Sequence, residues 1–177
     1  MTAVDPAYGR PAELLSTVEA SAAGGAAILA DHEERFVWTW YGTPERRAAL
    51  RADASAAFLA DLRARPGTYV PGALPRLPFA DDTFDLALCS HLLFTWSDVL
   101  DEEWHDQALL ELLRVAPHTR VFPLVVQGSG EPVPFLPGLL ERLRGRGHQV
   151  EVVGVPYEFQ RGADQMLILT RLGAALG

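Results

Sequence analysis

The chain has 177 residues, of which 49% are hydrophobic, so it is long enough for one domain with a sizeable core and is not expected to be disordered. Fifteen basic and 23 acidic side chains give a formal charge of −8, which argues against a nucleic-acid partner. The single cysteine excludes an intrachain disulfide, and no apolar run reaches the roughly 18 residues of a membrane span. We therefore expect a single cytoplasmic domain over residues 1–177, with neither nucleic acid nor membrane as partner.

The first part of the chain predicts two short strands and two helices. Residues 1–4 are apolar or β-capable, and an Asp-Pro pair ends them. Residues 11–31 have the apolar spacing of a helix. A Thr-Pro pair at residues 43–44 is a favourable helix start, and that helix is expected to run to about Arg63. Residues 68–72 are a second short strand candidate.

The rest of the chain predicts strand, helix, strand, helix, strand, strand. These elements are expected over residues 84–89, 102–115, 120–126, 135–144, 150–155 and 166–172. Strands that alternate with helices imply right-handed crossovers and a parallel sheet. Two final strands joined without a helix imply an antiparallel pair. The sequence therefore predicts an α/β fold with a mostly parallel sheet and an antiparallel C-terminal strand.

The run from Leu77 to Leu93, LPFADDTFDLALCSHLL, carries the most informative motif. An acidic turn at residues 81–83 leads into residues 84–89, an apolar run typical of a strand buried on both faces. Ser90 and His91 follow where that strand should end. Because ligands bind beyond the carboxyl ends of strands in an open parallel sheet, we expect both side chains to face a crevice.

This motif resembles the fourth strand and lead-in turn of class I S-adenosylmethionine-dependent methyltransferases, and the order of strands and helices agrees with that family. The resemblance implies a Rossmann-like sheet, S-adenosylmethionine as cofactor, and methyl transfer to a small-molecule acceptor. Because a sulfonium already carries an activated methyl group, such transfer needs mainly positioning of the two reactants. No catalytic side chain is therefore assigned from the sequence.

The glycine-rich turn that follows the first strand of the family is absent from the sequence. Residues 2–6 look like the family's second strand, so the first core strand is expected to be missing and the chain to be part of a longer enzyme. Loss of three or four buried aliphatic side chains would remove roughly 5–12 kcal/mol of stabilisation. That loss is comparable to the total stability of a domain, about 5–15 kcal/mol.

The resemblance assigns cofactor contacts to the ends of the first two predicted strands. Asp5 is expected to bind the ribose, with Pro6 and Ala7 on the adenine side. The alternatives are an aspartate that merely ends a strand, or the acidic residue of a Rossmann dehydrogenase. Many family members have an aspartate where this chain has Ala73, which leaves adenine recognition to backbone groups. The remaining predicted cofactor contacts lie at the end of the second strand and directly after it: Gly72, Ala73 and Leu74.

Further site residues are expected after the strand at residues 84–89. The resemblance places Ser90 and His91 against the cofactor, and His91, Phe94 and Trp96 around the substrate pocket. His91 is suited to orient a nucleophile or to act as a general base, because its unperturbed pKa lies near neutrality. The alternatives are a histidine that caps the next segment and aromatic side chains that pack in the core.

Two other functions remain open from the sequence. A non-catalytic methyltransferase-like binding module would show no thermal shift with the cofactor. A nucleotide-dependent oxidoreductase would be stabilised by a dinucleotide and not by S-adenosylhomocysteine. The histidines are scattered without metal-ligand spacing, so no metal is expected in either case.

Overall fold

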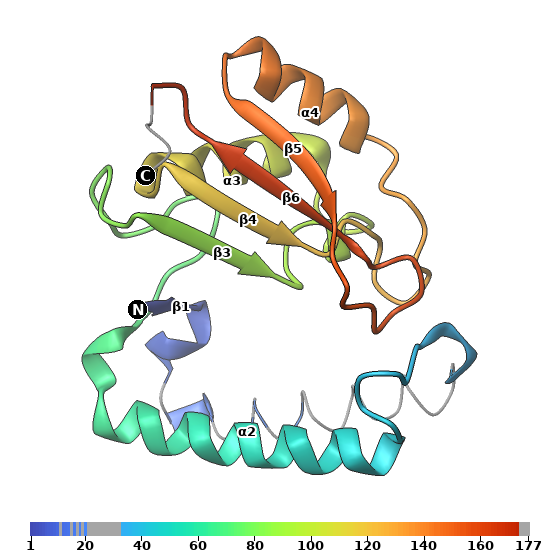
Figure 1. The fold of residues 1–177 in the computed structure, drawn as a ribbon. Coiled ribbons are helices and arrows are strands. Elements are labelled where there is room, and N and C mark those ends of the chain that lie inside the picture. Colours follow the sequence, from blue (N-terminus) through green and yellow to red (C-terminus); the bar gives the residue numbers. More distant parts are fainter. Residues whose placement is uncertain (11, 15, 17, 19, 21–32, 174–177) are drawn as a thin grey trace. The chain divides into compact units, whose positions relative to one another are not determined.

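The structure is a computed structural model that describes residues 1–10, 12–14, 16, 18, 20 and 33–173 (Figure 1). The chain divides into two compact units, Met1–Ala73 and Leu74–Gly177, and each is described by itself. The helix expected over residues 11–31 falls largely outside the described residues. The single-domain expectation stays a prediction.

The first unit contains two short parallel strands and one long helix. Strand β1 (Ala3–Val4) pairs in parallel with β2 (Tyr69–Val70). Helix α2 (Pro44–Ala64) begins as predicted, because the Thr43 side chain accepts a hydrogen bond from the Arg46 backbone N–H at 3.2 Å.

Short 3₁₀ turns connect the elements of both units. They are η1 (Pro6–Gly9), η2 (Glu33–Arg35), η3 (Pro66–Thr68) and η4 (Phe94–Trp96).

A cluster of three aromatic rings joins the strands of the first unit to α2. The Tyr8 ring centroid lies 5.3 Å from that of Tyr69 and 6.3 Å from that of Phe58. The Tyr69 hydroxyl also donates to Asp61 on α2 at 2.6 Å, and this hydrogen bond, followed by that from Arg65, lowers the pKa of Asp61. Because Tyr8 belongs to η1, the cluster fixes the turn that follows β1 against the helix.

The second unit is a four-stranded sheet in the order β3-β4-β6-β5. Its strands are β3 (Leu86–Ser90), β4 (His118–Phe122), β5 (Gln149–Gly154) and β6 (Gln165–Thr170). Strands β3 and β4 are parallel, whereas β6 pairs antiparallel with both β4 and β5. Three strands therefore share one direction and the C-terminal strand runs against them, which confirms the predicted α/β fold. The antiparallel strand lies inside the sheet, between β4 and β5.

Two amphipathic helices bury one face of this sheet (Figure 1). Asp101 caps the N-terminus of helix α3 (Glu102–Val115), because its carboxylate accepts a hydrogen bond from the Trp104 backbone N–H at 2.8 Å. Helix α4 (Leu136–Gly145) precedes β5. Leucines from both helices interlock with inward-facing strand residues. The side chains at the centre of this core are fully buried: Leu109, Leu113, Leu139, Leu143, Leu167 and Leu169.

The strand predicted at residues 120–126 is shifted in the structure. β4 begins at His118 and ends at Phe122. The next residue is Pro123, which has no backbone N–H and cannot continue the ladder of hydrogen bonds. The predicted end was wrong because the apolar run continues past this proline.

Strand β3 is buried on one face only, contrary to the sequence expectation. Cys89 is 9% exposed, whereas Leu86 is 47% and Leu88 is 70% exposed. Within the described part of this unit, β3 is one of the two outer strands, and the two helices pack on the face opposite to Leu86 and Leu88.

The acidic turn of the motif is held by two arginines. Arg114 on α3 contacts Asp81 at 2.7 Å and the Phe79 carbonyl oxygen at 2.9 Å, while Arg171, which follows β6, pairs with Asp82. Arg114 also contacts Glu111 at 2.7 Å, and the pKa of Glu111 is lowered chiefly by this hydrogen bond. The turn therefore has a structural role, since it clamps the chain that enters β3.

Cys89 is expected to be unreactive in the folded protein. Burial raises the pKa of its thiol to about 11, so roughly 0.1% or less would be thiolate at pH 8. A thiol-reactive chromogenic disulfide should therefore modify Cys89 in guanidinium chloride and react at least about 100-fold more slowly under native conditions. Rapid native modification would contradict the burial of β3 against the helices.

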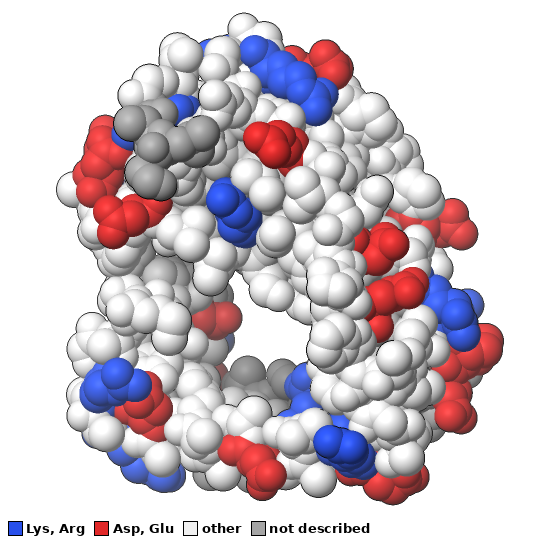
Figure 2. All heavy atoms as spheres, viewed as in Figure 1, with Lys and Arg blue, Asp and Glu red and all other residues white. Residues whose placement is uncertain are grey.

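No helix in the described part of the chain is long and apolar enough to cross a membrane. On the face drawn in Figure 2, basic and acidic side chains are interspersed. The cytoplasmic location and the expected absence of nucleic-acid and membrane partners stay predictions.

Candidate functional site

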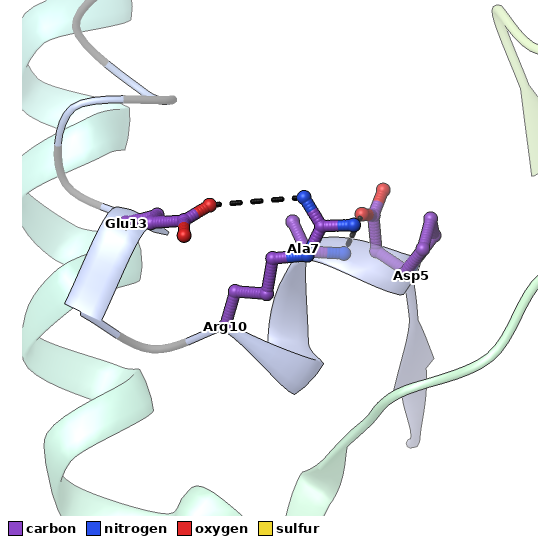
Figure 3. A pocket seen from close by; sticks show the side chains of 5 residues that line it. Asp5, Ala7, Arg10 and Glu13 are labelled. Atoms are coloured by element: carbon purple, nitrogen blue, oxygen red, sulfur yellow. Dashed lines mark hydrogen bonds and ion pairs between the residues drawn. The ribbon is translucent and has the colours of Figure 1, made fainter.

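A shallow pocket of about 230 Å³ lies at the carboxyl end of β1 (Figure 3). It belongs to the first unit, and its walls come from η1 and the residues on either side of it. The lining residues are Asp5, Pro6, Ala7, Arg10 and Glu13.

Asp5 is the first residue after β1 and is fixed by the turn that it starts. Its Oδ1 accepts from the Ala7 backbone N–H at 2.8 Å and so caps η1. Its own backbone N–H donates to the Val70 carbonyl oxygen at 3.3 Å, which ties it to the end of β2. No other hydrogen bond to the carboxylate is found among the described residues, so its second oxygen remains available to a ligand.

Arg10 and Glu13 form the charged side of the pocket, and the sequence analysis did not find them. Their side chains are 3.7 Å apart and 75% and 67% exposed, so the ion pair is weak and easily rearranged. The signal that was overlooked is a pair of opposite charges three residues apart, directly after the turn that Asp5 caps.

The end of β2 lies close to the same turn in the first unit. A Cβ atom added at Gly9 would lie 3.4 Å from Cβ of Pro71. Gly72 and Ala73 follow Pro71 and are half-buried and exposed, respectively. Leu74 is the first residue of the second unit and packs against its core. The structure thus brings the ends of β1 and β2 together, whereas Leu74 belongs to the second unit.

Ser90 and His91 form a hydrogen-bonded pair at the carboxyl end of β3. Ser90 Oγ lies 2.8 Å from His91 Nδ1, and the His91 backbone N–H donates to the Phe122 carbonyl oxygen at 2.8 Å. The ring of His91 lies edge-on to that of Phe122, with 5.7 Å between centroids. Burial lowers the pKa of His91.

His91 has a backbone conformation that few non-glycine residues adopt. Its φ of 55° lies in the left-handed region, where histidine is found more often than most side chains. Such residues concentrate at functional sites, because the surrounding structure must hold them there. His91 directly follows β3, and the crevice expected there stays a prediction.

The two aromatic residues assigned to the substrate pocket lie in different surroundings. Phe94 is fully buried and stacks on His105, with 5.3 Å between ring centroids, so it packs in the core. Trp96 is 45% exposed. His105 is itself fully buried, and its two ring nitrogens face the carbonyl oxygens of Asp101 and Leu93.

Gln160, which was not singled out in the sequence, joins the loop after β4 to the loop between β5 and β6. Gln160 Oε1 accepts from the Gly128 N–H at 3.2 Å, and its Nε2 donates to the Val126 carbonyl oxygen at 2.9 Å. Gly130 has φ +75°, and a Cβ there would lie 2.6 Å from the Arg161 carbonyl oxygen. The polar tract from Tyr157 to Gly162 is therefore a structural brace for the turn at residues 128–130.

Within the residues that the structure describes, no three His, Cys, Asp or Glu side chains are grouped so as to hold a metal ion. The side chains suited to an organic cofactor are those of the Asp5 pocket in the first unit. In the second unit, the hydrogen-bonded pair of Ser90 and His91 contains groups that are able to transfer a proton.

The fold of the second unit, with three strands in one direction and an inserted antiparallel strand, is that of a Rossmann-like methyltransferase sheet. Residues 37–119 match the model of a family described as a methyltransferase domain. This segment is a little under half of the chain, and over it the match confirms the resemblance to class I methyltransferases. The match includes the whole motif from Leu77 to Leu93, and therefore Ser90 and His91, but it does not reach Asp5.

A curated relative is an uncharacterized protein of the archaeon Methanocaldococcus jannaschii. It is 27% identical to this chain over 139 residues, which are 78% of this chain and 60% of the relative. The chain therefore spans about 60% of the length of the curated relative that it matches.

Proposed function

We propose that this chain binds S-adenosylmethionine and takes part in methyl transfer to a small-molecule acceptor. The observation that carries the proposal is the Asp5 pocket, in which a fixed carboxylate at the end of a parallel strand keeps one oxygen available. The methyltransferase domain matched by residues 37–119 supports the choice of reaction.

The residues of the pocket fit the ribose and adenine of this cofactor. Ribose hydroxyls are hydrogen-bond donors, and an ionised carboxylate is an acceptor with room for two of them. In the proposed complex Asp5 holds the ribose, while Pro6 and Ala7 offer small apolar surfaces to the adenine. The bound cofactor would supply a methyl group already activated by its sulfonium. Gly72 and Ala73 follow the neighbouring strand and have small side chains, so in the proposed complex their backbone groups contact the adenine.

Asp5→Asn is expected to weaken the binding of S-adenosylhomocysteine by about 10- to 100-fold, the effect of losing one charge-assisted hydrogen bond. Asparagine caps a helical turn about as well as aspartate, so the turn after β1 should remain intact. Isothermal titration calorimetry on the full chain measures the change. Glu13→Gln is the matched control, because it removes the charge of another carboxylate in the same pocket, whose side chain is 67% exposed, and we expect it to change affinity by less than about threefold. Equal affinities for Asp5→Asn and the unmodified chain would contradict the proposed role.

The same titration separates the other functions considered. An acidic residue at a strand end is also found where dehydrogenases bind the ribose of a dinucleotide. Binding of NAD or NADP, without binding of S-adenosylhomocysteine, would replace the proposal with an oxidoreductase. Binding of neither would favour a non-catalytic module that has kept the fold.

A further inference from the structure

The chain that follows β6 is held to the end of α4 by a histidine. Nδ1 of His148 accepts a hydrogen bond from the Leu172 backbone N–H at 3.2 Å. His148 lies between α4 and β5, and Leu172 is the second residue after β6. A side chain that titrates near neutrality therefore joins two segments of the second unit that are 24 residues apart in the sequence.

The turn that carries His148 is built to receive Leu172. Gly147 has φ +87°, and a Cβ atom there would lie 3.2 Å from Cδ1 of Leu172, so the glycine leaves room for the leucine side chain. The backbone N–H of Gly147 donates to the Arg144 carbonyl oxygen at 2.8 Å, and that of His148 donates to the Leu143 carbonyl oxygen at 3.2 Å. These bonds fix the backbone from which the imidazole ring extends.

The residue before Leu172 has anchors of its own. The Arg171 backbone N–H donates to the Pro117 carbonyl oxygen at 2.8 Å. Its guanidinium donates to the Leu113 carbonyl oxygen at 3.3 Å and pairs with Asp82. Because none of these bonds uses His148, the histidine acts on the chain from Leu172 onward.

The bond to Leu172 requires an unprotonated Nδ1. A neutral imidazole accepts at one ring nitrogen and donates at the other, so the hydrogen of His148 must lie on Nε2 while the bond exists. A protonated ring carries hydrogens on both nitrogens. Its Nδ1–H would then face the Leu172 N–H, and two donors cannot bond to each other. Protonation therefore removes this bond completely.

Two arginines are the charged groups that face the His148 ring. Arg146 follows α4 and is paired with Asp106 at 2.7 and 2.9 Å, while Arg171 follows β6 and is paired with Asp82. Burial of the ring, and next the positive charges of the two arginines, lower the pKa of His148 below its ordinary value of 6.5. The ring is therefore neutral at neutral pH, and the bond to Leu172 is present.

We propose that His148 is a pH-sensitive latch: its neutral ring holds Leu172 at the end of α4, and its protonation releases the chain from Leu172 onward. The folded state favours the neutral ring, so the latch is fully closed above the ordinary histidine titration. It opens as the pH falls through the titration of His148 in the folded chain. The release is local, because the bonds of Arg171 remain.

Hydrogen exchange measured by NMR on the full chain tests the latch. A titration of the His148 ring signals gives the midpoint. The protection factor of the Leu172 amide is then compared at pH 8 and at about one pH unit below the midpoint, where about nine-tenths of the rings are protonated. We expect it to fall by about 3- to 10-fold, the effect of losing one ordinary hydrogen bond. The Arg171 amide should keep its protection at both pH values.

Two results of this measurement would overturn the proposal. Equal protection of the Leu172 amide at both pH values would show that protonation does not release it. Loss of protection at Leu172 together with the amides of β6 would show that the whole sheet opens, so that no local latch exists.

His148→Asn separates the latch from other effects of pH. Asparagine keeps an acceptor oxygen close to the position of Nδ1 and does not titrate in this range. We expect its Leu172 amide to be protected equally at both pH values, whereas His148→Ala, which has no acceptor, should show low protection at both. Another titratable ring near this segment is His118, whose Nδ1 lies 3.3 Å from Thr170 Oγ1. His118→Asn is therefore the matched control and should leave the fall in protection unchanged. A fall that persists in His148→Asn would contradict the latch.

Arg146→Gln tests the link between the charge of the ring and the release. The substitution removes a positive charge beside the ring and leaves the segment after β6 unchanged. We expect the midpoint of the His148 titration to rise, because protonation meets less repulsion. The pH at which Leu172 loses protection should rise with it. A midpoint that moves while the pH of release stays fixed would show that another group controls the segment.

Discussion

Leu109→Ala is expected to lower the free energy of unfolding of the second unit by about 3–5 kcal/mol. Leu109 lies on α3 and is fully buried among leucines of α4 and the inward-facing residues of the sheet. Truncation removes apolar contacts and leaves a cavity that the close-packed surroundings can fill only in part. Urea unfolding followed by circular dichroism measures the change, and the midpoint should fall without a change in slope.

Leu88→Ala is the matched control for this substitution. The same chemical change is made on β3, where the side chain is 70% exposed. We expect a loss below about 1 kcal/mol, due mainly to the lower strand propensity of alanine. A loss at Leu88 as large as that at Leu109 would contradict the exposure of this face of the sheet.

Arg114→Met is expected to destabilise the same unit by about 2–3 kcal/mol. The substitution keeps much of the aliphatic stem and removes the hydrogen bonds to Glu111, Asp81 and the Phe79 carbonyl oxygen. It also leaves the largely buried Glu111 carboxylate without its arginine, and among the described residues the Leu77 backbone N–H is then its remaining hydrogen-bond donor. Arg144→Met is the control, because Arg144 pairs with the exposed Glu141 and should cost less than about 1 kcal/mol. Similar losses for the two variants would show that the acidic turn is not clamped by Arg114.

The destabilisation by Arg114→Met should depend on pH. Arg114 holds the pKa of Glu111 below its ordinary value of 4.5 in the folded chain. A carboxyl group with a lowered folded pKa contributes stability above its unfolded pKa, and this contribution is lost as the pH falls through the folded pKa. The difference between the unmodified chain and Arg114→Met should therefore be full at pH 7 and shrink below about pH 4.5. Urea unfolding at both ends of this range measures it, and a difference that does not change with pH would contradict the role of Glu111.

Local signals in the sequence were sufficient for the three longer helices that the structure describes, α2, α3 and α4. Thr43 and Pro44 predicted the start of α2, and the helix expected over residues 102–115 has the observed bounds of α3. These signals succeed because capping and proline effects act within one turn of the chain. The strand expected over residues 84–89 was also found, although it starts two residues later and ends one residue later, at Leu86–Ser90.

The features that were missed depend on partners far away in the sequence. An apolar run does not reveal whether one or both faces of a strand are covered, which is why the exposure of Leu88 was unexpected. An apolar run also does not show that β6 inserts between β4 and β5, because the pairing partners and register of a strand are set by the whole sheet. In the candidate site, Asp5 was identified from its place after a strand. The contact between Ser90 and His91 was not predicted, nor was the positive φ of His91, because the pattern of residues does not fix the backbone conformation after a strand.

The placement of β6 has a consequence for biosynthesis. This strand is made after β3, β4 and β5, yet it supplies the hydrogen-bonding partner of both β4 and β5. While the nascent chain is still on the ribosome, those two strands emerge with open edges and with the leucines of α3 and α4 uncovered on one side. The unit can close only when Thr170 has left the exit tunnel. A chain that terminates before residue 165 would therefore lack β6. We expect such a product to stay incompletely folded and to depend on chaperones, although its helices can form.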